Sequence, residues 1–275
     1  MLDLNALASE RENLMGFAKK LEQHPDRLGH ALRFLVNHFN PKVLEPATTT
    51  FVSNEIIELC DNSIDSIGDD VSFKDVKLGS TEIIFLEKPI EIIGGYTKIV
   101  NFIFVSVNPS NQEITFMTFQ DAGGVNGCFT AYPDNKIGDI ASGTYISDTS
   151  RPTLGKETST KNYIKVIKYY LAICSWRSSK IVVNDIQEVS RSFRKRAGNQ
   201  DTRVRIIKLR QKETFNKSFG NSNRSYSCRW IVRGFFRRQW YPRTQEHKLI
   251  FVDSFVKGPK DAEFKVTEQI RLVTR

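Results

Sequence analysis

The C-terminal part of the chain holds the pattern that most restricts the fold. Residues 228–236 alternate with a period of two, which places successive side chains on opposite faces of an extended strand. A turn at residues 242–247 and a second β-rich run at 248–252 follow, so the pattern predicts a hairpin. One face can enter a core (Cys228, Trp230, Val232 and Phe236), and the other face is cationic with interleaved apolar residues (Arg229, Ile231, Arg233, Phe235 and Arg237).

The same stretch carries a motif that resembles a family signature. It reads R-W-I-V-R-G-F-F-R-R-Q-W-Y-P and then H-K-L-I-F-V-D-S-F-V-K-G-P. This resembles the C-terminal signature R-W-x-V-R-G-H-W-R-x-Q-W-Y-P, followed by H-R-x-x-W-I-x-x-Y-x-K-G-P, of uncharacterised proteins from actinobacteria, their plasmids and their phages. The resemblance implies a setting in mobile elements and no assigned chemistry. Phe235 and Phe236 stand where the family has His-Trp, so the resemblance implies no catalytic histidine at this position of the chain.

Composition limits the class of protein. A chain of 275 residues with 40% apolar content can form one large or two modest domains. No apolar run approaches the ~20 residues that a membrane span needs, and the start M-L-D-L-N-A-L-A-S-E does not resemble a secretory signal. We therefore expect a cytoplasmic protein with no membrane partner. The widely separated cysteines predict reduced, mostly buried thiols and no zinc site (Cys60, Cys128, Cys174 and Cys228).

Charge divides the chain into two unlike halves. Residues 1–150 hold 11 Lys and Arg against 21 Asp and Glu, a net charge of −10, whereas residues 151–275 hold 29 against 10, a net charge of +19. Such a basic segment favours an anionic partner, and nucleic acid is the commonest one. The alternative is that the acidic half docks on the basic half.

The acidic half predicts helices followed by strands. Apolar stripes predict a helical hairpin over residues 3–40 and a further helix over 53–64, which leads into an acidic patch (Asp61, Asp65, Asp69 and Asp70). Residues 82–87, 90–93, 99–107 and 113–119 are β-rich and predict an antiparallel sheet. Gly123, Gly124 and Gly127 indicate loops, and no phosphate-binding glycine motif is found.

The basic half predicts a long helix and a second sheet. Polar residues and residues that interrupt helices and strands occur together at positions 148–158, which favours a domain boundary between 1–150 and 151–275. The following helix buries a stripe (Tyr163, Ile164, Ile167, Tyr170, Leu171 and Cys174), and a separate lysine stripe either contacts phosphates or is a solvated face. Residues 181–187, 203–210 and 264–273 predict strands. The fold class is α+β: a helical hairpin with an antiparallel sheet, then a long helix with a basic antiparallel sheet.

Arginines with interleaved rings are the predicted functional surface. Guanidinium groups bind phosphate in a fork geometry and exposed rings stack on unpaired bases, so the pattern favours DNA or RNA with single-stranded character. The alternative is that the rings belong to the core and the arginines cover their edges. The predicted binding residues are Arg203, Arg205, Arg229, Arg233, Phe235, Arg237, Arg238, Trp240 and Tyr241, with Lys161, Lys165 and Lys168.

Two other function classes stay open. Asp253, Glu263 and Lys265 have the residue types of a metal-dependent nuclease, which would use Mg²⁺. The acidic half could instead bind a protein partner. The sequence favours a non-catalytic, nucleic-acid-binding accessory protein of a phage or mobile element, without a cofactor or metal.

Overall fold

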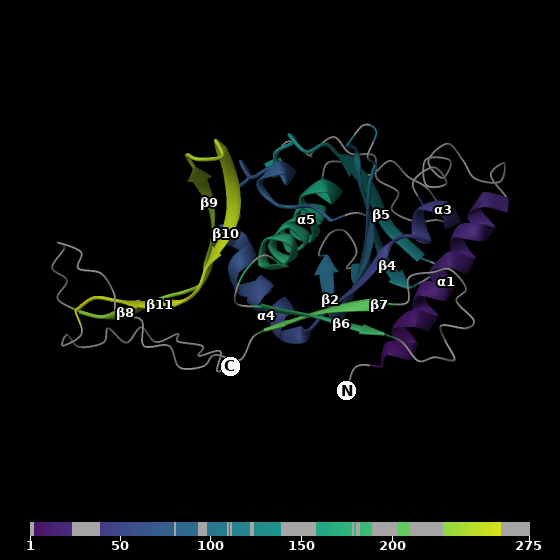
Figure 1. Cartoon of the computed structure of the whole chain (residues 1–275), viewed down its shortest axis with the longest axis horizontal. Helices are drawn as coiled ribbons and strands as arrows, with labels where there is room; N and C mark the ends of the chain where they lie inside the picture. The colour runs from purple at the N-terminus through teal and green to yellow at the C-terminus, as the bar shows by residue number, and fades with distance from the viewer. Residues whose placement is uncertain are drawn as a thin grey trace.

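A mixed seven-stranded sheet forms the centre of the protein, with helices on both faces (Figure 1). The computed structural model describes residues 3–23, 39–79, 81–92, 98–108, 110, 112–121, 124–138, 158–177, 179, 182–188, 203–209 and 228–259. None of the described helices combines the length and the apolar character that crossing a bilayer requires.

The strand order of the sheet is β5-β4-β3-β2-β1-β7-β6. β1 pairs in parallel with both of its neighbours, β2 on one side and β7 on the other. The remaining pairs are antiparallel, and Pro89 coincides with a register shift in β2 because proline has no N–H to donate. The bounds are β1 Thr48–Val52, β2 Glu82–Ile92, β3 Lys98–Val107, β4 Ile114–Asp121, β5 Gly124–Ala131, β6 Val182–Glu188 and β7 Arg203–Leu209.

One face of the sheet is covered by α1 (Leu4–Gln23) and the short α3 (Pro41–Leu44) (Figure 1). Asp3 begins α1 by accepting hydrogen bonds from the amides of Asn5 and Ala6 at 2.9 and 3.1 Å. The buried stripe of α1 packs on phenylalanine rings that line up across the strands. Phe102 stacks on Phe119 at 4.8 Å between centroids, so this half of the core is largely aromatic.

The opposite face is covered by α4 (Asn54–Ser63), α5 (Thr158–Arg177) and two 3-10 turns, η2 (Ile64–Ser66) and η3 (Phe73–Asp75). Every described side chain of α5 from Tyr169 to Trp176 is buried, which makes α5 the central helix of this layer. Burial raises the pKa of the Cys174 thiol to about 12, so it is protonated at neutral pH. Cys60 and Cys128 are also buried, Cys228 is half-buried, and all four thiols are free, as expected.

The C-terminal strands form a bent two-stranded arm. Its strands are β8 (Trp230–Val232), β9 (Phe235–Tyr241), β10 (Glu246–Val252) and β11 (Phe255–Lys257). β9 pairs with β10 and β8 pairs with β11, and the register is the same in both pairs. The arm is therefore one hairpin, interrupted where residues 233–234 lie opposite residues 253–254. Figure 1 shows β9 and β10 beside the body while β8 and β11 project away from it.

Several predicted elements agree with this structure. The first helix of the N-terminal pair, the helix after residue 53, the helix after residue 158 and the C-terminal hairpin are all present. The second helix of the predicted pair and the strand at 264–273 lie outside the described residues. The boundary at 148–158 lies almost wholly outside them, and strands from both sides of it share the seven-stranded sheet.

The prediction that Gly124 and Gly127 lie in loops was wrong. Both belong to β5, at the edge of the sheet. A Cβ atom on residue 127 would lie 2.2 Å from the hydroxyl oxygen and 2.3 Å from the ring of Tyr163. The Tyr163 hydroxyl donates a 2.6 Å hydrogen bond to the carbonyl of Asn126. Glycine is therefore required by the close approach of α5 to the strand, not by a turn.

Replacing Gly127 by alanine should destabilise the protein. The Tyr163 ring would have to move and lose its hydrogen bond, so we expect a loss of about 2 kcal/mol in the free energy of unfolding, as for other overpacked cores. Gly16→Ala in α1 is the matched control because no atom lies within 4 Å of its added Cβ, and it should stabilise the helix by about 0.5–1 kcal/mol. Urea denaturation of both variants measures the difference. Equal stabilities would contradict the close approach.

Candidate nucleic-acid interface

The arm is fixed to the body by a cluster of three aromatic rings. Trp176 of α5 lies 5.2 Å from Phe236 and 5.5 Å from Phe251, and the two phenylalanines are 5.1 Å apart, centroid to centroid. Two hydrogen bonds support this cluster. The Ser175 hydroxyl donates to the Leu249 carbonyl at 2.8 Å, and the Phe236 amide donates to the Ser66 hydroxyl at 2.7 Å. The position of β9 and β10 is thus set by the hydrophobic core.

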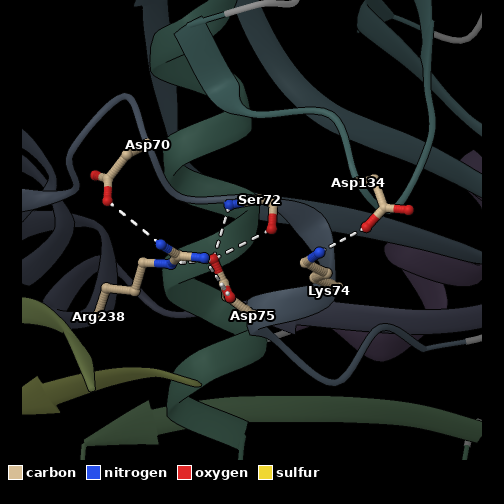
Figure 2. Close-up of polar contacts among 6 residues, drawn as sticks. All are labelled: Asp70, Ser72, Lys74, Asp75, Asp134 and Arg238. Carbon is tan, nitrogen blue, oxygen red and sulfur yellow. Dashed lines mark hydrogen bonds and ion pairs between the residues drawn. The ribbon is translucent and has the colours of Figure 1, made fainter. Parts of the chain in front are cut away.

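Arg238 adds a charged contact on the same side of the arm (Figure 2). Its Nε donates to the buried carboxylate of Asp75 at 2.7 Å, and its Nη1 lies 3.5 Å from the more exposed Asp70. Asp75 also accepts from the Ser72 amide at 2.9 Å, which completes a capping box at η3. Arg238, a predicted nucleic-acid ligand, is engaged in holding the arm.

Other contacts join the acidic and basic halves. Lys168 of α5 lies 3.5 Å from Asp69, and the Tyr169 hydroxyl donates to Asp61, where burial and that carboxylate raise the tyrosine pKa. Arg177 ends α5 with a bidentate ion pair to the buried Glu82. The acidic half therefore docks on part of the basic half, which is the alternative that the charge distribution left open.

The face of the arm turned away from the core carries the exposed cations Arg233 and Arg237, whereas Arg229 on the same face is half-buried. Strand alternation places Arg229, Ile231, Arg233, Phe235, Arg237, Gln239 and Tyr241 on this face, which we call the outer face. Phe236, Arg238 and Trp240 lie on the opposite, inner face. Arg233 and Arg237 are exposed, and Phe235 is partly buried. Of the four residues predicted for the core face, Phe236 is buried, whereas Cys228, Trp230 and Val232 are half-buried.

Exposed rings lie on both faces of the arm beside the hairpin turn that joins β9 to β10. Tyr241 is 38% exposed on the outer face, with the Lys248 ammonium 5.5 Å from its ring centroid. Trp240 is 44% exposed, and its ring lies 4.8 Å from that of His247 on the inner face. The alternative that Trp230, Trp240 and Phe236 are core residues is therefore wrong for Trp240 and holds for Phe236, and Trp230 is half-buried.

Other predicted binding residues lie on different elements. Arg203 and Arg205 are on β7 of the central sheet, and Lys165 and Lys168 are on α5. The Lys165 ammonium lies 5.8 Å from the ring centroid of Tyr169, and the side chain of Lys161 lies outside the described residues. Among the elements that the structure describes, the arm brings predicted arginines together with predicted rings.

The alternative nuclease site is described at one position only. Asp253 lies where the arm bends, and its carboxylate accepts a 2.9 Å hydrogen bond from the Ser254 amide. Glu263 and Lys265 lie outside the described residues.

Two cations of the arm were not predicted from the sequence. Lys248 lies on the outer face because it pairs with Gln239, and Arg243 lies in the exposed turn. The hairpin register would have found Lys248, since the predicted turn at 242–247 fixes which residues face each other. The role of Asp75 gave no sequence signal, because its partner is 163 residues away.

Comparisons with known proteins add a loose likeness in fold. No protein-family model and no curated protein sequence matches the chain. Among solved structures, the chain is similar to the crystal structure of AcrVA2, with a TM-score of 0.44 and 11% sequence identity over 92% of this chain and 96% of that chain. At this identity and TM-score, no function is transferred.

Arg238→Ala should destabilise the protein more than Arg237→Ala. Removing Arg238 leaves the buried Asp75 without its guanidinium partner, which should lower the free energy of unfolding by about 2–3 kcal/mol. Arg237 is on the opposite, exposed face, so its removal should cost less than about 0.5 kcal/mol. Urea denaturation of both variants, with Asp75→Asn to complete a double-mutant cycle, tests this. A coupling energy near zero would rule out the contact as an anchor.

Proposed function

We propose that this chain is a non-catalytic nucleic-acid-binding accessory protein of a phage, plasmid or related mobile element. The mobile-element setting rests on the C-terminal signature alone. The binding function rests on one observation: the arm is anchored through its inner face and presents exposed arginines on its outer face.

The charges of the outer face support this proposal. Among the described residues, Arg237 and Arg243 form no ion pair, while Arg238 on the inner face has two carboxylate neighbours. A cation whose field is not cancelled nearby attracts a polyanion and releases the counterions condensed on it. The contacts between the two halves thus reduce the positive charge on the inner face of the arm, around Arg238, and the outer face stays basic.

The exposed rings favour a partner with single-stranded character. Tyr241 presents an apolar ring to solvent beside the Lys248 ammonium. Stacking on a ring requires an unpaired base, and it contributes roughly 1–3 kcal/mol per base. A duplex hides its base faces, so it would use the arginines of the arm but not the ring.

The double variant Arg233→Ala/Arg237→Ala should bind single-stranded DNA or RNA more weakly and with a lower salt dependence. Each lost phosphate contact lowers the slope of log K against log salt by about 0.7, and two lost contacts at about 0.1 M salt correspond to roughly a twentyfold loss of affinity. Fluorescence anisotropy at several salt concentrations measures both quantities.

Lys19→Ala/Lys20→Ala is the matched control, because it removes the same charge from exposed positions of α1. Its affinity and salt slope should stay close to those of the unmodified protein. Unchanged binding in the arginine variant, or an equal loss in the lysine variant, would contradict the assignment to the outer face. Cleavage of the labelled strand on adding Mg²⁺ would instead favour the nuclease.

A further inference from the structure

The outer face of the arm has a regular composition along β8 and β9. Arginine recurs at every fourth residue, at positions 229, 233 and 237, and Tyr241 takes the next place in the series. Ile231, which is 40% exposed, and Phe235 lie between the arginines. All of these side chains share one face because the register is unchanged across the bend.

The spacing of this row corresponds to a different number of nucleotides in each nucleic-acid form. A strand rises about 3.4 Å per residue, so neighbouring arginines are separated by about 13–14 Å of contour. A B-form strand advances about 3.4 Å per nucleotide along its axis, so about four nucleotides pass between two arginines. An extended single strand advances roughly twice as far per nucleotide, which places an arginine at every second phosphate.

The bend of the arm also favours a flexible partner. β8 and β9 are interrupted at Arg233 and Gly234, and β8 then leaves the body in a new direction (Figure 1). Gly234 is required there, because an added Cβ would lie 2.5 Å from the Phe251 ring that belongs to the aromatic anchor. The bend therefore lies directly beside the aromatic anchor. Duplex DNA, with a persistence length of about 150 base pairs, does not follow a bend over so short a distance without a cost, but a single strand does.

We infer that the outer face is a linear track for an extended single strand of nucleic acid, with arginines at alternate phosphates and the Tyr241 ring as the terminal base platform. This inference rests on the proposed nucleic-acid binding and adds its substrate form and site size. The contour from Arg229 to Tyr241 is about 40 Å, which corresponds to about six nucleotides of extended single strand.

The test is a length series of labelled oligothymidylates of four, six, eight and twelve nucleotides, with a twelve-base-pair duplex, bound to the full chain. Affinity, corrected for the number of binding registers, should rise up to about six nucleotides and then level off. The duplex should bind at least about tenfold more weakly at the same salt concentration. Arg229→Ala should move the plateau to about four nucleotides, and its thermal unfolding reports whether the arm remains folded.

A ring variant tests the track independently of Arg229. Tyr241→Ala should weaken binding of the six-nucleotide strand by about tenfold, whereas Tyr132→Ala, at an exposed tyrosine outside the arm, should leave it unchanged. Because Trp240 lies on the inner face, Trp240→Ala should have a smaller effect than Tyr241→Ala.

The outcomes separate the two proposals. Binding without a plateau near six nucleotides, duplex binding as tight as single-strand binding, or a larger loss for Trp240→Ala than for Tyr241→Ala would each overturn the track while leaving nucleic-acid binding intact. No measurable binding to any oligonucleotide would overturn the proposed function itself.

Discussion

The packing of Trp176 against Phe236 and Phe251 is the interaction on which the arrangement of the surface depends. It connects α5, the most buried helix, to the base of the arm. A two-stranded hairpin is marginally stable alone, so the arm needs this anchor to keep its shape. Because strand alternation is strict, burying Phe236 turns Phe235 and Arg237 outward. The direction of the cationic face is thus a consequence of an aromatic contact in the core.

Local patterns predicted the elements that depend on local periodicity. The stripe of α5, the stripe of α4 and the two faces of the hairpin all follow from spacing within a few turns or residues. The sheet order was not predictable in the same way. β1 reads T-T-T-F-V, too short and polar to be recognised as a central strand, yet it lies between β2 and β7. Its burial is decided by partners more than 30 and 150 residues away.

The same distinction between local spacing and distant contacts applies to the residues of the candidate site. That Arg233 and Arg237 face away from Phe236 could be deduced from their odd spacing. The ion pair of Arg238 with Asp75 could not be deduced in this way. The neighbouring sequence contains several similar arginines, and nothing in it indicates the distant carboxylate. Gly127 was misread for a similar reason. Its requirement comes from the Tyr163 ring of another element, whereas local sequence offers only the usual association of glycine with loops.

The opposite charges of the two halves have different consequences at the two faces of the arm. On the inner face, Asp70 and Asp75 neutralise Arg238, and the ion pair is shielded enough by burial to help fix the arm. On the outer face, Arg237 has no carboxylate neighbour among the described residues, so its field extends into solvent. Since the acidic residues that the structure describes around η3 contact only the inner face, the remaining charge is directional, and a directional row of cations favours a linear anion over a compact one.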